Sequence, residues 1–399
     1  MRILLFTLWF VAGISHAEIN LLVRASAVAQ SDETSFQSWG VSHQRFANND
    51  IALSQALLSF DTLVTDDWYI HGVFNGYSDG EEKLGFTQLY AKYRPLTANK
   101  IKPEVKVGFF YPAMSVENTD IGWLSTHFLS NSAINSWIGE ELRTAGIEVS
   151  FRKNGRQTRS PWSWKVVGSL YKGNDTTGTL LAWRGFALHD RQSIHDDRIN
   201  FPPIPGVVND NGIDAPAWTD PFREIDTNIG FYLGGHLAYK RDTDLRYYYY
   251  DNRANPLIVD PDRIYAWQTR FHSLAIRHRI SPELTLLSQG LMGSTKMGYD
   301  IVDNDFYAAY AALIYTQQSH TYSARLDWYQ VVDNDSFMYD PNASRGEALS
   351  LHYEYKINDR LSVATEWQTN RGRKANRRFF VTRENYVENS LQLALTFRY

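Results

Sequence analysis

The last nine residues of the chain show a strand-like repeat that constrains the whole fold. In residues 391–399, leucine, phenylalanine and tyrosine alternate with glutamine, alanine, threonine and arginine, and Tyr399 is the final residue. A two-residue period gives a β-strand one apolar and one polar face. A strand of a soluble β-sandwich could show the same pattern. Because the alternation recurs along most of the chain, it favours a transmembrane β-barrel, whose strands face lipid on one side and a polar lumen on the other.

The first 17 residues follow a different pattern. Arg2 precedes a short apolar run from Ile3 to Ile14, and the run is followed by Ser15, His16 and Ala17. A basic start, a short apolar core and a small-x-small exit predict a signal peptide that is cleaved after Ala17. An uncleaved anchor is disfavoured because the run is too short to span a bilayer. Residues 18–399 are then expected to form a single barrel domain in a bacterial outer membrane.

Composition supports a barrel over other classes of membrane protein. After residue 17 no apolar run approaches the length of a membrane helix, the mean hydropathy is −0.39, and the chain has 24 Tyr and 12 Trp. These values fit a barrel, in which half of each strand faces water and aromatic residues mark the two membrane interfaces. With no Cys, neither disulfides nor a Cys-ligated metal site can form. The net charge of −4 argues against nucleic acid as a partner.

Period-2 segments predict sixteen antiparallel strands, the even number expected of a bacterial barrel. The predicted strands are 19–30, 51–60, 67–77, 85–94, 104–111, 141–152, 162–171, 227–239, 243–251, 264–279, 282–294, 305–318, 321–332, 346–357, 360–370 and 389–399. The apolar phase slips between Phe271 and Leu274, which suggests a β-bulge near Ser273. The segment 305–318 is apolar on both faces, so its phase is not assigned.

Connections between these strands alternate in length. Tight turns are expected at 279–283, 318–320 and 357–360, and long polar loops at 252–263, 295–304, 332–345 and 371–388. Short periplasmic turns that alternate with longer external loops are typical of outer-membrane barrels. Residues 178–188 could form another strand, but this would break the parity, so 172–226 is predicted to be one external loop that folds back into the barrel as a constriction.

A second long loop, 112–140, is too apolar to extend into water. Its side chains are expected to pack in the vestibule or against a neighbouring subunit, and these are Trp123, Phe128, Ile134, Trp137 and Ile138. The acidic residues of this loop are candidates either for the pore mouth or for capping and turn roles. They are Glu117, Asp120, Glu140 and Glu141.

A sixteen-stranded barrel is wide enough for an aqueous channel, in which lining charges select among solutes. The predicted pore-lining and constriction residues are Arg184, Asp190, Arg191, Asp196, Asp197, Arg223, Glu224, Arg246, Arg270, Arg325, Glu354 and Glu366. Both signs are present and no Lys/Arg ladder is evident, so weak ion selectivity is expected. Two alternatives remain: wall residues that only form salt bridges, and a loop that is merely a solvated surface.

The sequence contains no recognisable motif for catalysis or metal binding. No Gly-x-Ser-x-Gly elbow is present, and the pairs around His189 and His195 match no metal-ligand spacing. The chain is therefore expected to have no catalytic residue, no metal and no cofactor.

One stretch resembles a known family. Tyr90-Ala-Lys-Tyr-Arg-Pro95, followed by Lys106-Val-Gly-Phe-Phe-Tyr-Pro112 and Ser115-Val-Glu-Asn-Thr-Asp120, is similar to Gram-negative outer-membrane porins of the phosphate-selective type. The resemblance implies a sixteen-stranded barrel, often trimeric, with inward-folded loops. The anion-selective members of that family depend on a lysine and arginine ladder that this sequence lacks, so phosphate specificity is not inferred.

The sequence thus predicts an outer-membrane porin for passive diffusion of small hydrophilic solutes or ions. Two alternatives are a closed barrel that acts as a receptor or structural protein, and an outer-membrane hydrolase.

Overall fold

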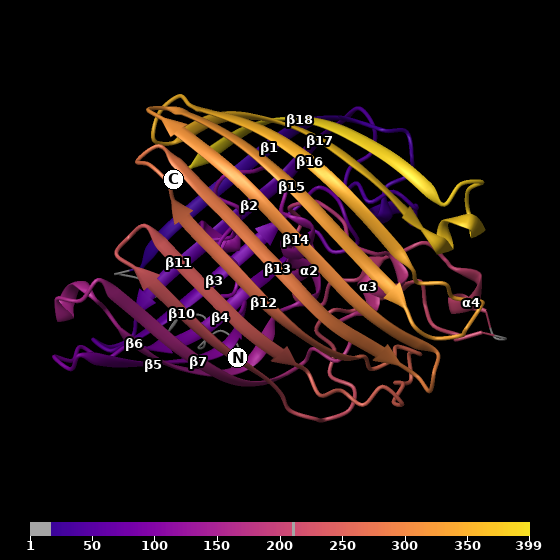
Figure 1. The fold of residues 1–399 in the computed structure, drawn as a ribbon, viewed down its shortest axis with the longest axis horizontal. Helices are drawn as coiled ribbons and strands as arrows, with labels where there is room; N and C mark the ends of the chain where they lie inside the picture. Colours follow the sequence, from indigo (N-terminus) through magenta and orange to yellow (C-terminus); the bar gives the residue numbers. More distant parts are fainter. Residues whose placement is uncertain (1–16, 210–211) are drawn as a thin grey trace, which may run out of the picture.

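The computed structural model describes residues 17–209 and 212–399, so residues 1–16 of the predicted signal peptide lie outside the described residues. Sixteen antiparallel strands form a closed barrel around a filled interior (Figure 1). In barrel order from the N-terminus they are β1 (Glu18–Gln30), β2 (Asp50–Leu63), β3 (Trp68–Gly76), β4 (Leu84–Tyr93), β5 (Ile101–Phe110), β6 (Thr144–Lys153), β7 (Trp162–Lys172), β10 (Gly230–Tyr239), β11 (Thr243–Asp251), β12 (Gln268–Arg279), β13 (Leu284–Met297), β14 (Val302–Gln317), β15 (His320–Asp333), β16 (Ser344–Lys356), β17 (Leu361–Lys374) and β18 (Asn385–Arg398). The predicted number and order of strands are confirmed.

The terminal strand closes the barrel, as its alternation predicted. β18 pairs with β1, with Leu393 opposite Ala27, and the amide of Leu21 donates to the carbonyl of Tyr399 at 2.9 Å. Leu393 is 54 % exposed on the outer face, whereas Ala394 is 1 % exposed on the inner face. Closure removes the free strand edges that would otherwise leave backbone groups unpaired.

Two ends of the barrel differ in their connections. At one end, here called the turn end, strands are joined by short segments such as 240–242 and 318–319. At the other, the loop end, most connections are longer, and two of them span 111–143 and 173–229. No helix in the described part of the chain is long and apolar enough to cross a membrane.

Several strands extend further towards the loop end than predicted. β13 ends at Met297 and β14 begins at Val302, so the long loop predicted at 295–304 is a short connection. β17 continues to Lys374 and β18 begins at Asn385, which shortens the predicted loop 371–388. The apolar alternation stops before the hydrogen-bonded ladder does, and polar strand ends therefore resemble loops in the sequence.

The predicted bulge near Ser273 is wrong. The β11–β12 and β12–β13 registers run without a shift through this region, with Phe271, Ser273 and Ala275 all buried on the inner face. The apolar phase changes because the inner face becomes apolar, not because the strand slips. Register shifts occur instead between Arg24 and Ala25 on β1, and between Val73 and Phe74 on β3.

Shorter elements lie within the connections. They are the 3₁₀ helices η2 (Phe36–Ser38), η3 (Ile121–Trp123), η4 (Arg156–Thr158) and η5 (Ala375–Phe379), the helices α2 (Ala133–Glu141), α3 (Thr179–Trp183) and α4 (Pro205–Val208), and the strands β8 (Ile199–Asn200) and β9 (Trp218–Thr219), which pair only with each other. Residues 178–188, rejected above as a barrel strand, contain α3.

Candidate functional site: the filled lumen

Two connections enter the barrel from its loop end. The first infolded segment is residues 111–143, between β5 and β6, and the second is residues 173–229, between β7 and β10. Both contribute helices to the interior, where α2 contacts β13, β14 and β15, and α3 contacts β14 and α2 (Figure 1). The inward folding predicted for 172–226 is therefore observed, and of the two alternatives for 112–140, the structure shows its apolar residues packed inside the barrel.

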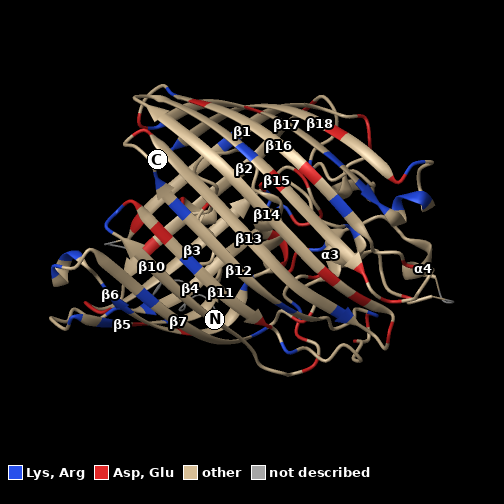
Figure 2. Ribbon diagram, in the orientation of Figure 1, with Lys and Arg blue, Asp and Glu red and all other residues tan. Residues whose placement is uncertain are grey.

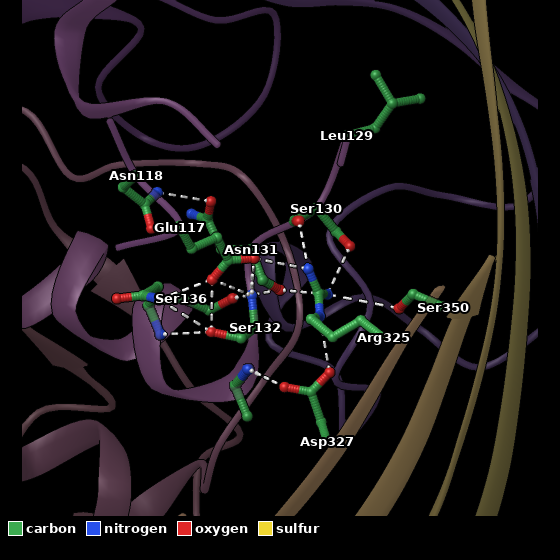
Figure 3. A network of polar contacts seen from close by, with 12 residues as sticks. Glu117, Asn118, Leu129, Ser130, Asn131, Ser132, Ser136, Arg325, Asp327 and Ser350 are labelled. Carbon is green, nitrogen blue, oxygen red and sulfur yellow. Dashed lines mark hydrogen bonds and ion pairs between the residues drawn. The ribbon is translucent and has the colours of Figure 1, made fainter. Parts of the chain in front are cut away.

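Arg325 on β15 anchors the first infolded segment to the wall. Its side chain is fully buried and donates to Glu117 Oε1 at 2.7 Å, to Asp327 Oδ2 at 2.8 Å, and to the carbonyls of Ser130 and Asn131 at 2.9 Å each (Figure 3). A guanidinium has five donors in a rigid fork and is suited to hold several acceptors at once. One wall residue thus binds three residues of the first infolded segment and one residue of its own strand.

The carboxylates of this network also hold the start of α2. Asp327 accepts from the Ala133 amide at 3.0 Å, while Glu117 accepts from the Ser132 hydroxyl at 2.7 Å. Ser132 is itself the N-cap of α2, and its hydroxyl accepts from the Asn135 amide at 3.2 Å. Orphan amides at a helix N-terminus favour nearby negative charge. Glu117 therefore has a capping role, one of the two roles considered for the acids of the first segment.

A second wall acid, on another strand than Asp327, secures the same segment. Glu366 on β17 is 3 % exposed and accepts from the amides of Leu129 and Ser130 at 2.7 and 3.0 Å. The segment is thus bound to β15 and β17 on the far side of the lumen from β5, its point of entry.

The opposite face of α2 packs on an aromatic part of the wall. Trp137 is fully buried, and its ring centroid lies 5.4 Å from those of Phe271 on β12 and Phe306 on β14. Phe271 in turn stacks on Tyr250 of β11 at 4.8 Å. The aromatic character of β14 on its inner face, which left its phase unassigned, is explained by this packing.

The second infolded segment crosses the lumen from β12 and β13 to β1 and β2. At its start, Gly178 has φ +113° and lies against the hydroxyls of Thr269 and Thr295, so a Cβ there would overlap them. Only glycine fits this combination of backbone conformation and close approach. At the other side, Asp190 contacts Arg24 of β1 at 3.4 Å.

Ion pairs hold the second segment in the interior. Arg184 forms a two-pronged pair with Glu140 of α2, at 2.6 and 2.5 Å, and links the two infolded segments. Burial works to raise the pKa of Glu140, but the charges of Arg184 and His189 outweigh it and lower the pKa to about 2. Glu140 is therefore ionised across the physiological range.

Further along, Asp190 and Arg191 are bound to the loop-end rim. Asp190 accepts from Arg45 at 2.6 Å, and Arg45 also pairs with Asp79 at 2.6 Å. Arg191 pairs with Asp197 at 2.7 Å. Arg24, Arg45 and Asp79 belong to this cluster but were not predicted from the sequence. Of these three, only Arg24 lies in a barrel strand, so only its position could have been predicted from the alternation of inward and outward residues.

Glu141 joins the two segments by a different contact. Its carboxylate accepts from the amides of Gly178 and Leu180, at 2.9 and 2.8 Å, and from the Trp137 indole at 2.5 Å. Burial raises the pKa of Glu141 to about 7, although the three donors oppose this rise. The residue thus couples α2 to α3 through a carboxylate that titrates near neutrality.

The infolded segments leave little water access at mid-height. Residues 128–144 and 174–194 are buried throughout. Arg184, Asp190, Arg191 and Asp197, which the sequence predicted for a constriction, lie within or beside these stretches and are all buried in ion pairs.

The turn end of the lumen is more open and carries opposed charges. On β5–β7, Lys106 and Lys165 flank Glu148 at 3.5 and 3.7 Å, while Arg152 pairs with Glu104 at 2.8 Å. Among the inward-facing charges of β4–β7, β11 and β12 at this end, the cations outnumber the acids: the cations are Lys92, Lys102, Lys106, Arg152, Lys165, Arg246 and Arg277, and the acids are Glu104, Glu148 and Asp244. These side chains define what we call the turn-end vestibule.

A cavity of about 270 Å³ lies in the turn-end vestibule and is lined in part by Arg152, Lys165, His236, Asp244 and Arg277. Within the described chain, no ion pair is found for Arg277. Lys92, Lys106 and Lys165 were missed by the sequence analysis, although each occupies the inward phase of its strand.

Other predicted residues occupy different places. Arg270 is exposed on the outer face of β12, because the inner face is occupied by Thr269 and Phe271, so its lumen-facing assignment is wrong. Asp196 lies on the surface with its side chain 83 % exposed, next to His195. Arg246 does face the lumen and pairs with Asp244 at 2.9 Å.

Three remaining predicted residues lie near the two ends. Arg223 and Glu224 join surface loops at the loop end, where Glu224 pairs with Lys172 at 2.7 Å and Arg223 with Asp260 at 2.5 Å. Glu354 faces inward on β16 and is partly exposed. The predicted constriction set is therefore divided: one group is buried at mid-height, and the others lie at the rims or outside.

One group of acids has the spacing for a cation. Asp175, Glu224 and Asp226 have carboxylate oxygens within 4.8 Å of one another at the neck of the second segment. Their oxygens accept from backbone amides, including those of Ile225 and Gly173. The cluster thus has a structural explanation as a loop closure.

Comparison with known proteins places the fold. Neither a family model nor a curated protein matches the chain by sequence. Solved structures do match in fold. The outer membrane channel DcaP of Acinetobacter baumannii matches with a TM-score of 0.58 at 10 % identity, covering 96 % of this chain and 97 % of that one.

Two further structures give the same result. OmpF of Salmonella typhi, in complex with daunomycin, has a TM-score of 0.56 at 10 % identity, covering 96 % of this chain and 97 % of that one. OmpT of Vibrio cholerae in a trimer form has a TM-score of 0.55 at 9 % identity, covering 96 % and 99 %. The chain thus has the fold of outer-membrane barrels of the porin kind; none of the three singles out the phosphate-selective type.

Proposed function

We propose that this protein is an outer-membrane channel for passive diffusion of small hydrophilic solutes, whose narrowest level is formed by the two infolded segments. The observation that carries the proposal is the architecture itself: a closed sixteen-stranded barrel in which two long connections fold inward above a charged vestibule. A barrel of this size holds an aqueous path unless segments fill it. Export by the N-terminal signal, location in the outer membrane and the absence of catalysis all belong to this proposal.

A solute can pass the middle of the lumen only if part of the protein moves. Because residues 128–144 and 174–194 are buried throughout, a solute has to move side chains or part of an infolded segment. α2 is held by apolar packing of Trp137 on Phe271 and Phe306, whereas the second segment is held in part by polar contacts that water can replace, such as the pairs Arg184–Glu140 and Asp190–Arg45. Segments held in this way can exchange between arrangements, whereas a continuous apolar core resists opening.

A preference for anions is the finer part of the proposal. Unpaired cations of the turn-end vestibule, such as Arg277, raise the local concentration of negative solutes. The balance of signs expected from the sequence becomes a net positive lining of the turn-end vestibule once Lys106 and Lys165 are included.

A closed barrel with a receptor or structural role is the second candidate. The continuous burial of 128–144 and 174–194 favours it, because such packing is what a permanently plugged lumen would show. A trimer is compatible with both candidates, as OmpT of Vibrio cholerae was solved in a trimer form.

Planar-bilayer recording of the refolded protein separates the two candidates. We expect discrete open steps in the intact protein, and larger steps after deletion of residues 190–222, which removes Asp190 and Arg191 from the second segment. Arg270→Ala, on the outer face, is the matched control and is expected to leave conductance unchanged. Folded protein that stays silent, with and without the deletion, would reject the channel in favour of the closed barrel.

A further inference from the structure

A patch of arginines lies on the outer surface of the barrel at the loop end of β16 and β17 (Figure 2). Arg345 and Arg373 are exposed on the outward faces of these strands and lie directly opposite each other in the ladder. Arg371 occupies the next outward position of β17, opposite Glu347. These residues are named here the arginine patch.

Neighbouring acids neutralise only part of the arginine patch. Arg371 pairs with Glu347 at 2.5 Å, and both side chains are more than half exposed. A single further acid, Glu384, contacts Arg373 at 2.7 Å and Arg378 at 4.0 Å. Three arginines thus share two carboxylates.

Arg345 and Arg383 add uncompensated positive charge. Neither side chain has an ion pair or hydrogen bond within the described part of the chain. Like charges directly opposite each other in a ladder, here Arg345 and Arg373, destabilise the strand pair unless an anion lies between them. The arrangement therefore favours an external anion over the bare protein surface.

The surface is hollowed at this point. Two depressions, of about 430 and 210 Å³, both include Arg345 and Arg373 in their lining. Trp328 and Asn385 line the larger one. Two guanidinium groups that converge on one depression match the geometry of a phosphate, which arginine binds through paired donors.

The position of the patch identifies the kind of phosphate. Towards the turn end, the outward faces of β16, β17 and the neighbouring β18 are apolar, with Leu351, Trp367 and Leu391 exposed by 45, 38 and 50 %. Cations thus lie directly beyond the apolar belt, at the level where lipid headgroups begin. At the corresponding end of β13 and β14, by contrast, Lys296 is neutralised by Asp303 at 2.6 Å.

We propose that the arginine patch binds the phosphate of a lipid headgroup in the surrounding leaflet, with Arg345 and Arg373 as its two ligands. The acyl chains of this lipid lie along the apolar surface below, beside Trp367 and Leu391. This inference rests on the proposed location in the outer membrane, but it does not depend on whether the lumen conducts.

Lipid binding to the detergent-solubilised protein tests the inference, with native mass spectrometry as the readout. The probes are bis-phosphorylated lipid A, the same lipid after enzymatic dephosphorylation, and inorganic phosphate as a competitor. The variants are Arg345→Gln/Arg373→Gln and the matched control Arg270→Gln, which removes an outward-facing arginine from β12.

We expect lipid A to bind the intact protein and the control equally, and the double variant about tenfold more weakly, since charge-assisted contacts to phosphate are lost. Dephosphorylated lipid should bind the intact protein as weakly as lipid A binds the double variant. Equal binding of lipid A by all three proteins would overturn the proposal, and so would equal binding with and without the phosphates. Complete displacement by equimolar inorganic phosphate would overturn the lipid assignment. The dephosphorylation arm needs no variant, and bilayer recording tests the channel separately.

Discussion

The inner wall of the barrel has two halves that differ in the kind of side chain that faces the lumen. Beside the infolded segments, the wall from β10 to β14 is lined by aromatic and aliphatic residues, such as Tyr232, Tyr250, Phe271 and Phe306, against which these segments pack. From β15 around through β18 and β1 to β6 it is lined by polar and charged residues, such as Arg325, that bind the same segments through ion pairs.

The difference shows that a lumen-facing position need not be polar. Where an infolded segment packs, the wall behaves as the core of a soluble protein, and apolar side chains gain by burial. Where backbone amides and carboxylates of the segment have to be satisfied, the wall supplies charges instead. Two experiments test the two halves of the wall, and two further ones test the junction between the segments and the vestibule charges. They are ordered from the largest expected effect to the smallest.

Removing Arg325 tests the polar half. Arg325→Met leaves Glu117 and Asp327 buried without their cation, which we expect to cost about 4 kcal/mol in the free energy of unfolding. The first infolded segment should also detach more often and produce larger conductance steps. Urea unfolding and bilayer recording measure these effects, with Arg270→Met as control. An unchanged unfolding midpoint would show that the network contributes little to holding the segment.

Truncating Trp137 tests the apolar half. Trp137→Ala opens a cavity between α2, Phe271 and Phe306, with an expected cost of about 3 kcal/mol. Trp367→Ala removes the same kind of side chain from the outer face of β17, where it is 38 % exposed, and should cost clearly less. Equal losses in urea unfolding would contradict a packed interface between α2 and the wall.

The pH dependence of stability tests the junction between the segments. Because burial raises the pKa of Glu141 to about 7, from an ordinary value of 4.5, its contribution is fully present below about pH 4.5 and is lost as pH rises through 7. Intact protein should therefore lose about 2 kcal/mol between pH 5 and pH 8 relative to Glu141→Gln, which does not titrate. Parallel pH profiles of the two proteins would show that Glu141 does not titrate in this range.

The smallest effect concerns ion selectivity. Replacing Lys106 and Lys165 by glutamine lowers the positive charge of the turn-end vestibule, and we expect the anion-to-cation permeability ratio to fall about twofold, as partly screened charges contribute about 0.5 kcal/mol. Reversal potentials under a salt gradient measure the ratio. Lys296→Gln, at the other end of the barrel, serves as control. If the ratio falls equally in the control, the vestibule cations are not what determines the ion selectivity.

Much of the barrel was predictable from the sequence. Outward-facing alternation in residues such as Leu391, Leu393 and Leu395 is dictated by lipid, which acts uniformly around the wall. The number of strands and their order followed from that pattern, and the inward folding of 172–226 followed from strand parity and from the length of the loop. The buried group Arg184, Asp190, Arg191 and Asp197 was identified as a cluster because its charges are close in sequence.

The interior was not predictable to the same degree. Arg270 was placed in the lumen from strand phase, whereas its strand neighbour Phe271 occupies the inward position and packs on Trp137. The partners of Arg325 in the infolded segment, such as Ser130 and Glu117, are more than 190 residues away in the chain. No local pattern encodes such a contact.

By itself, then, the sequence determined the elements that respond to a uniform surrounding: the signal-like start, the strand period and the closed barrel. Tertiary structure decided which connections fill the lumen, which acids cap α2 and which arginines remain on the outer rim. The physical reason is that lipid requires an apolar side chain at every outward position that it covers, whereas the side chain required at an inward position depends on the particular segment packed against it.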